Sequence, residues 1–223
     1  MTQAPPSTGA LPLAPEDVAT ARSLAAATLY EANGQRGALD PAIHQIAPGL
    51  GLCGPALTIR CQPGDNLTLH AAVACANPGD VLVADVGDFA DAGHWGEILT
   101  VAALSRQIAG LVINGGVRDV AALPVHGFPV FARAVSMKAA TKLIHGLINV
   151  PIVCGGVQIA PGDLIVGDAD GVVAIRQGEV RDVLRRAEER EANEAVMMQR
   201  LREGALTIDL LELRGKIPAE GRR

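Results

Sequence analysis

One continuous apolar stretch constrains the fold of this chain more than any other part of its sequence. Leu111, Val112 and Ile113 follow Gly110 as a run of large apolar side chains, and two of the three are β-branched. A run without polar alternation is typical of a parallel strand that is covered on both faces. We therefore predict an α/β protein built around a buried parallel sheet.

The residues after this strand have the chemistry of a binding site. Gly115 and Gly116 are expected to let the backbone turn, and Arg118 and Asp119 follow. In open α/β sheets, ligands bind at the carboxyl ends of the strands. Arginine binds carboxylates through two hydrogen bonds, and aspartate binds hard cations. Neighbours on a turn point in different directions, so their charges are not expected to cancel. These residues predict an oxoacid and metal site; a surface pair opening a helix toward Leu123 fits equally well.

Composition and charge narrow the class further. The chain has 223 residues, 49% of them hydrophobic, with 25 glycines and only five aromatic residues, which suits one α/β core of small aliphatic side chains. The net charge of -5, without a basic cluster beyond 181–190, argues against a nucleic-acid surface. No apolar run reaches the ~18 residues of a membrane helix, and the first fifteen residues lack a signal-peptide pattern. We expect a cytoplasmic protein without membrane or nucleic-acid partners.

The four cysteines are scattered and show neither a C-x-x-C pair nor a zinc spacing. We expect them to be buried thiols in a reducing compartment. They are Cys53, Cys61, Cys75 and Cys154.

The rest of the chain predicts alternating strands and helices in a single domain over 15–213, with a disordered tail over 1–14 and a second tail over 214–223. The order from 80 to 135 predicts right-handed parallel crossovers, and the strand-dense part after 129 predicts a sheet that closes or folds over. The expected helices cover 15–32, 66–76, 96–107 and 178–203, with a short helix between Asp119 and the strand from 129 and one more turn in 207–213. The expected strands cover 54–61, 80–86, 110–114, 129–135, 152–159 and 164–175, the last broken at 168–171.

A second candidate site lies in the loop before the helix that starts near Gly96. The amino end of a helix exposes unpaired N–H groups that attract anions. Because this loop follows the strand 80–86, it falls at the same sheet edge as Arg118. An ordinary capped helix shielded by Trp95 is the alternative. His94 is more typical of a surface loop than of a catalytic base.

Three other patterns are set aside. The Gly49–Gly54 segment matches G-x-G-x-x-G, but a strand follows it where a nucleotide site needs a helix. Residues 168–171 resemble the start of a calcium loop without its final glutamate, and a tight turn fits better. Lys138 and Lys142 lie in a polar, helix-like context, which disfavours a Schiff-base lysine.

The long carboxy-terminal helix has acidic and basic residues at i, i+4 spacing, which predicts ion pairs on a solvated face. A helix of this length also has a surface on which another subunit can pack. The charged residues are Arg185, Arg186, Glu188, Glu189, Arg190, Glu191 and Glu194.

The chain resembles the metal-dependent 4-hydroxy-4-methyl-2-oxoglutarate / 4-carboxy-4-hydroxy-2-oxoadipate aldolases, which are related to the RraA-like regulators of RNase E. The pairing of a Gly-Glu loop with Arg-Asp about twenty residues later is the most specific part of the likeness, which covers about 15–213. The matching segments are Ala27–Gly34, Trp95–Leu99, Asn114–Asp119, Pro161–Asp163 and Asp168–Val173.

The resemblance implies an α/β/β/α fold of the swivelling phosphohistidine-domain type with terminal helices. It also implies that Arg118 binds the pyruvyl carboxylate of the substrate and that Asp119 holds Mg²⁺ or Mn²⁺. Glu97 would support a metal-bound water. The amides expected to cradle the substrate belong to Gly96, Glu97, Ile98 and Leu99.

The resemblance further implies a homotrimer or homohexamer with its active site between subunits. A carboxylate from the carboxy-terminal helix of a neighbouring subunit would complete the site. Glu194 is the match for this carboxylate, and Glu191 is the alternative.

The implied activity is cleavage of a 4-hydroxy-2-oxo dicarboxylic or tricarboxylic acid to pyruvate and an oxoacid, as in the degradation of aromatic compounds, with oxaloacetate decarboxylation as a side activity. The competing hypothesis is a non-catalytic RraA-like regulator of RNase E that acts by binding protein. Glu194 favours the aldolase. Sequence alone leaves open the preferred oxoacid, the choice of metal and the oligomeric state.

Overall fold

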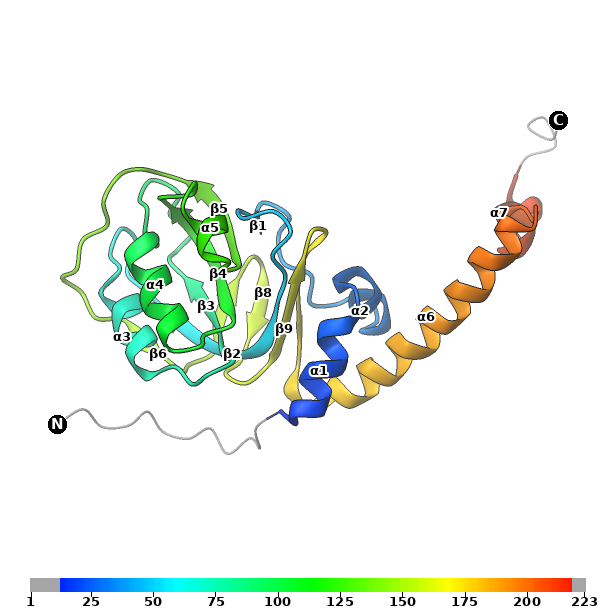
Figure 1. Ribbon diagram of the computed structural model, residues 1–223, viewed down its shortest axis with the longest axis horizontal. Helices are drawn as coiled ribbons and strands as arrows, with labels where there is room; N and C mark the ends of the chain where they lie inside the picture. Colours follow the sequence, from blue (N-terminus) through cyan, green and yellow to red (C-terminus); the bar gives the residue numbers. More distant parts are fainter. Residues whose placement is uncertain (1–12, 218–223) are drawn as a thin grey trace.

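A computed structural model describes residues 13–217 as a curved sheet with helices packed on two sides (Figure 1). The strands are β1 (His44–Gln45), β2 (Leu52–Arg60), β3 (Val81–Asp85), β4 (Gly110–Val117), β5 (Val130–Val135), β6 (Leu147–Ile148), β7 (Ile152–Cys154), β8 (Val157–Ile159), β9 (Leu164–Asp168) and β10 (Gly171–Ile175). The helices are α1 (Pro15–Ser23), α2 (Ala26–Ala32), α3 (Leu67–Cys75), α4 (Glu97–Ser105), α5 (Leu123–His126), α6 (Val180–Arg202) and α7 (Thr207–Leu210), with 3-10 turns at Gln177–Glu179 and Arg214–Lys216.

The main sheet has the strand order β1-β5-β4-β3-β2-β9-β10, with β6 paired to β2. Strands β2 to β5 are parallel, whereas β9 and β10 are antiparallel to their neighbours. The segment before β1 contacts the far end of the sheet, because Leu39 N donates to Val172 O over 2.9 Å. The sheet is therefore nearly closed like a barrel. The α/β class and the closing sheet are confirmed; the swivelling phosphohistidine-domain type stays a prediction.

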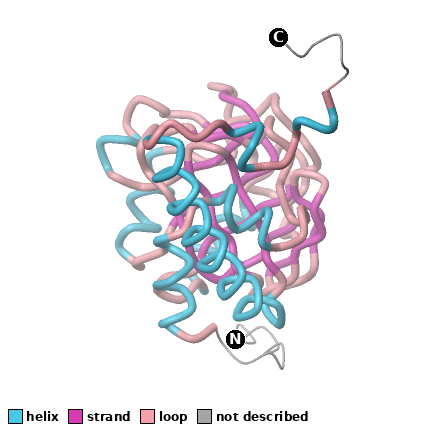
Figure 2. Tube along the Cα trace, turned by 90° about the vertical axis from the view of Figure 1, so that its right-hand side faces the viewer, coloured by secondary structure: helices cyan, strands magenta, loops and turns pink. Residues whose placement is uncertain are grey.

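Apolar packing explains the arrangement of the helices. Helices α3, α4 and α5 cover the parallel strands on one side, and Trp95 stacks on Phe128 within that layer at a ring distance of 5.8 Å. Helices α1 and α2 and the first turns of α6 cover β9 and β10. Viewed from the side of α6, these helices lie in front of the strands (Figure 2). A third cluster of aliphatic side chains and Phe131 fills the inside of the curved sheet.

Two predicted elements are each split in two. The helix expected over 15–32 is interrupted after Ser23, because Leu24 is buried with an extended backbone and Ala26 N donates to the distant Asp168 carboxylate over 2.8 Å. The strand expected over 152–159 is the hairpin β7–β8, since Gly155 and Gly156 take positive φ angles at its turn. The prediction was wrong in both places because the breaks depend on contacts or turn geometry that periodicity does not reveal.

The predicted turn at Gly115 and Gly116 is also wrong, since both residues lie within β4. These positions need glycine because other segments pass very close to them. A Cβ at Gly115 would lie 2.1 Å from Val86 Cγ2, and one at Gly116 would lie 2.5 Å from Ala92 O. The two glycines therefore allow close packing rather than a change of chain direction.

The termini and cysteines add smaller corrections. Residues 1–12 of the predicted first tail lie outside the described residues, and the second predicted tail begins with a 3-10 turn in which Arg214 pairs with Asp209. Cys75 is exposed, whereas the other three cysteines are buried as expected. Within residues 13–217, none of the helices combines the length and apolar character needed to span a bilayer.

Substitution of Gly116 by alanine should destabilise the protein, because the new methyl group would meet backbone oxygen atoms that cannot move freely. Overpacking of this kind costs roughly 1–3 kcal/mol. We expect Gly116→Ala to lower the urea midpoint of unfolding by a corresponding amount. Gly178→Ala is the matched control, since a methyl group there meets no atom within 4 Å. Equal midpoints for the two variants would contradict this account of β4.

Candidate active site

Two loops meet beside the end of β4, as the sequence predicted. Arg118 N donates to Trp95 O over 2.8 Å, and Trp95 forms a parallel bridge with Val117. The loop that follows β3 therefore runs alongside the last residues of β4. Because of this pairing, Gly96 at the start of α4 lies next to Arg118 and Asp119.

Glycine makes this close approach possible. A Cβ on Gly96 would lie 2.4 Å from Asp119 Oδ2 and 3.1 Å from Arg118 Cγ. A Cβ on Gly93 would lie 2.8 Å from Arg118 Cβ. Any larger residue at either position would push the arginine and aspartate side chains away from the loop.

Asp119 interacts with both the helix and the arginine. Its backbone has a φ of 57°, an uncommon conformation for a residue other than glycine, which turns the side chain toward α4. Its Oδ2 accepts a hydrogen bond from Glu97 N at 3.0 Å and lies 3.7 Å from Arg118 Nε. The prediction that the two charges point in different directions is therefore wrong. Since the first amide of α4 is bound by Asp119, the amides of Ile98 and Leu99 are the ones left without an acceptor among the described residues.

A small cavity of about 60 Å³ opens between these loops. It brings together most of the predicted site residues, namely Arg118, Asp119, Gly96, Ile98 and Leu99, and it adds three that the sequence interpretation missed. The added residues are Asn66, His70 and Lys142, and Gly93 and His94 complete the lining.

Two of the three missed residues have a buried polar atom without a partner. Asn66 is 7% exposed and donates from Nδ2 to His94 O over 2.7 Å, but its buried Oδ1 has no partner. His70 lies one helical turn further and its buried Nε2 has no partner either. Burial, followed by the nearby charge of Lys142, lowers the pKa of His70. The i, i+4 spacing of Asn66 and His70 was the available sequence signal, whereas Lys142 lies in an irregular loop and not in the helix-like context predicted for it.

His94 is a buried structural residue and not the surface residue that was predicted. Its side chain has no exposed area, Nε2 accepts from Gly64 N at 3.1 Å, and Nδ1 lies 3.2 Å from Gly116 O. One ring nitrogen accepts and the other donates, so the imidazole is neutral. Burial lowers the pKa of His94, which agrees with this assignment.

Glu97 lies at the site only through its backbone. Its side chain turns toward α5, where Oε1 lies 2.8 Å from His126 Nε2. The glutamate side chain is therefore not among the groups that line the cavity.

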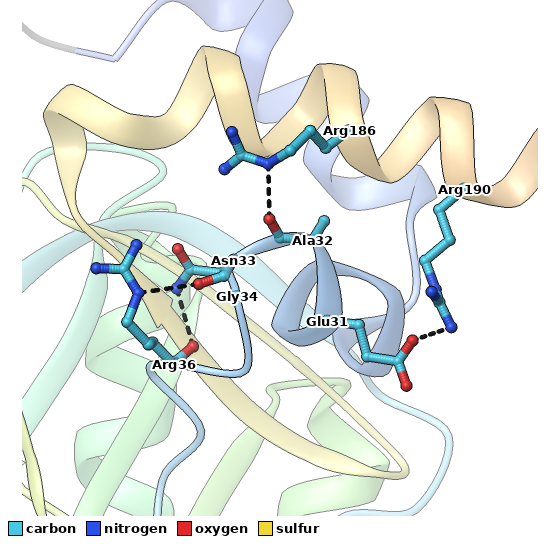
Figure 3. Close-up of a pocket in the computed structure, with 7 residues that line it drawn as sticks. All are labelled: Glu31, Ala32, Asn33, Gly34, Arg36, Arg186 and Arg190. Carbon is cyan, nitrogen blue, oxygen red and sulfur yellow. Dashed lines mark hydrogen bonds and ion pairs between the residues drawn. The ribbon is translucent and has the colours of Figure 1, made fainter.

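Glu194 lies on α6 and outside the cavity of its own chain. Arg190 pairs with Glu194 Oε1 at 2.9 Å, as the i, i+4 pattern predicted, and also with Glu31 of α2. Figure 3 shows Arg186 and Arg190 reaching from α6 to the end of α2, where Arg186 Nε donates to Ala32 O. The buried residues of α6 all lie between Val180 and Ala187, so the rest of the helix projects away from the core (Figure 1).

The described residues supply few ligands for a metal ion. Among residues 13–217 there is no group of three histidine, cysteine or acidic side chains that could hold one. Asp119 Oδ1 is without a hydrogen-bond partner in this part of the chain and is open to a ligand. One carboxylate is compatible with Mg²⁺, which keeps several waters and needs only one or two carboxylates together with substrate oxygens.

The fold and this arrangement of residues define an RraA-like protein. The chain belongs to the RraA-like family (Aldolase/RraA), which it matches over residues 19–174. A protein of Halalkalibacterium halodurans, provisionally named 4-hydroxy-4-methyl-2-oxoglutarate aldolase, is 40% identical over 155 residues, 70% of this chain and 74% of the relative.

Solved structures agree with this assignment. An uncharacterized protein of Pseudomonas syringae pv. tomato is 29% identical with a TM-score of 0.80, covering 88% of this chain and 97% of that one. RraAS2 of Streptomyces coelicolor, described as an unusual member of the RNase ES inhibitor RraA protein family, is 25% identical with a TM-score of 0.78. The match covers 85% of this chain and 98% of RraAS2.

The buried His94 should make stability depend on pH. Its pKa is lower in the folded than in the unfolded chain, so its contribution is complete above the unfolded value near 6.5 and is lost as the pH falls below it. The slope for one such group is at most about 1.4 kcal/mol per pH unit. We expect His94→Gln to flatten the decline in unfolding free energy between pH 7.5 and 5.5, measured by urea denaturation. The exposed His44 gives the control variant His44→Gln. An unchanged slope in His94→Gln would mean that folding does not lower the pKa of His94.

Proposed function

We propose that this protein is a metal-dependent pyruvate aldolase that cleaves 4-hydroxy-2-oxo acids with two or three carboxylates. The observation that carries the proposal is the juxtaposition of the Arg118 guanidinium, the Asp119 carboxylate and the free amides at the start of α4 around one cavity. The provisional name of the Halalkalibacterium relative supports the same chemistry.

The lining residues suit the parts of such a substrate. Arg118 binds the pyruvyl carboxylate, with the Ile98 and Leu99 amides directed at the same anion. Lys142, which also lines the cavity, pairs with a second carboxylate of the substrate. Asn66 Oδ1, a buried acceptor without a donor, accepts a hydrogen bond from the substrate hydroxyl.

The reaction needs a group that accepts electrons. Transfer of the hydroxyl proton to water and cleavage of the C3–C4 bond release the second oxoacid and leave the enolate of pyruvate, which takes a proton from water at C3 to give pyruvate. Loss of CO₂ from oxaloacetate leaves the same enolate. Asp119 would hold Mg²⁺ or Mn²⁺, which stabilises negative charge that develops on oxygen. Arg118 holds the carboxylate beside that charge and keeps the substrate oriented.

A neighbouring subunit completes the site in this proposal. The projecting half of α6 carries Glu194, and Val196 and Met198 on the same half are 63% and 48% exposed. An isolated helix with exposed apolar side chains is stabilised by packing on a second copy. We propose a homotrimer or homohexamer, located in the cytoplasm, in which Glu194 reaches the Asp119 region of the next subunit; Glu191 is the alternative.

Pyruvate release from oxaloacetate tests the activity. EDTA should abolish it, and Mg²⁺ or Mn²⁺ should restore it. Arg118→Lys should lose at least about tenfold in kcat/KM, because lysine cannot form the two parallel hydrogen bonds of the guanidinium and such a charge-assisted pair contributes roughly 1.5–3 kcal/mol. Metal-independent turnover, or borohydride trapping of a pyruvyl adduct on Lys142, would overturn the metal-dependent mechanism.

Complementation tests the shared site. Asp119→Asn and Glu194→Gln are each expected to be nearly inactive as pure oligomers. Mixing them under conditions that exchange subunits should restore part of the activity, because some interfaces regain both native groups. Mixtures of Asp119→Asn with Asp119→Asn subunits are the control. Failure to recover activity despite mass-spectrometric proof of exchange would place the whole site in one chain.

A regulator of RNase E is the second candidate, favoured by the likeness to the Streptomyces RraAS2 structure. In that case the chain would bind and inhibit an RNase E-type enzyme without any requirement for Arg118. Inhibition of RNA cleavage by Arg118→Lys as strongly as by the native chain, together with no turnover of oxoacids, would favour the regulator.

A further inference from the structure

A buried carboxylate, Asp65, lies behind the cavity and has no place in the chemistry above. Asp65 is 2% exposed and its side chain accepts four hydrogen bonds from nearby donors. Two are short, from Thr141 Oγ1 and Leu143 N at 2.6 Å each, and a third comes from Ile144 N at 3.3 Å. The fourth comes from Leu67 N at 2.9 Å, at the start of α3. Three of the four donors thus belong to one loop.

The residues on either side of Asp65 also bind the loop 141–144. Thr141 N donates to Gly64 O over 2.8 Å, and Asn66 N donates to Thr141 O over 2.9 Å. Gly64 N in turn donates to the imidazole of His94. Residues 64–66 therefore connect three parts of the cavity wall: the loop 141–144, the start of α3 and the loop before α4.

Apolar packing does not hold the loop 141–144 in place. Leu143 is 80% exposed and Ile144 is 51% exposed, so neither side chain is buried against the core. The residues from 142 to 146 also form no helix or strand. Three hydrogen bonds to Asp65 fix this segment, together with the backbone bonds of Thr141 and the bond from Gly146 N to Thr68 Oγ1. Lys142 lies between two of the donors to Asp65.

We propose that Asp65 is a positioning residue that fixes Lys142 in the cavity and thereby sets the affinity for the second carboxylate of the substrate. This inference rests on the proposed function for the identity of the ligand. Its structural part, the attachment of the loop by Asp65, is independent of any activity.

The electrostatics of Asp65 suit such an anchor. Burial alone raises the pKa of a carboxyl group, but the hydrogen bonds from Thr141, Leu143, Leu67 and Ile144 outweigh it and lower the pKa of Asp65 to about 2. The carboxylate is therefore charged at every pH at which an aldolase would work. Hydrogen bonds to a charged acceptor are stronger than those between neutral groups.

The experiment compares Asp65→Asn with Asp91→Asn. Asp91 pairs with Lys138, which lies shortly before the loop 141–144, at 2.7 Å. Both side chains are 66% exposed, so this ion pair contributes little to stability. Native-state hydrogen exchange of residues 139–146 and tryptic cleavage after Lys142 report loop opening without a substrate. We expect both to be at least about tenfold faster in Asp65→Asn and unchanged in Asp91→Asn. Thr141→Val, which removes the contacts of Oγ1 with Asp65 and Gly64 O at constant size, replaces Asp65→Asn if that variant does not fold.

Kinetics then separate positioning from general destabilisation. Asp65→Asn should raise KM for oxaloacetate far more than it lowers kcat, and combining it with Lys142→Ala should add nothing to the KM of Lys142→Ala alone. The proposal would be overturned if the effects of Asp65→Asn and Lys142→Ala on KM were fully additive. It would also be overturned if hydrogen exchange of the loop in Asp65→Asn were as slow as in the native chain. If the native chain turns over no oxoacid, the proposed function fails, whereas the exchange data still decide whether Asp65 fixes the loop.

Discussion

The site depends on how closely the loop before α4 passes the end of β4. The hydrogen bond from Arg118 N to Trp95 O sets this separation, and it leaves no space for a Cβ on the facing glycines. Gly93 and Gly96 face Arg118 and Asp119. Gly116 faces the backbone of the same loop at residues 90 and 92. The position of both charged side chains is therefore fixed by backbone packing, and their chemistry follows from it.

Charge in the cavity follows from this packing. Asp119 is stabilised by the first amide of α4 and by Arg118, so its negative charge is partly offset before any ligand binds. Among the lining side chains, Arg118 and Lys142 are positive, Asp119 is negative and His94 is neutral. An excess of positive charge favours a substrate with more than one carboxylate over a neutral carbonyl compound.

Sequence reasoning was most successful where structure depends on local pattern. The strand before Arg118 and the helix after Gly96 were predictable from apolar runs, and their meeting followed from the rule that parallel strands end at one edge. The break at Leu24 was not predictable, because a carboxylate 142 residues away binds the next helix. Lys142 was missed for the same reason: its loop is held by Asp65, and no local pattern connects residues 77 positions apart.

Two polar atoms without hydrogen-bond partners indicate where a ligand would bind in the cavity. A buried polar atom without a hydrogen-bond partner costs about 1–3 kcal/mol, and native chains rarely keep one without a use. Asn66 Oδ1 and His70 Nε2 are two such atoms, and both belong to residues that line the cavity beside Arg118. Arg118 follows β4, whereas Asn66 and His70 lie at the start of α3 and within it. In the proposed function one ligand would meet both, with a carboxylate at Arg118 and a hydrogen-bonding group at the atoms of α3, and a hydroxylated oxoacid carries both groups.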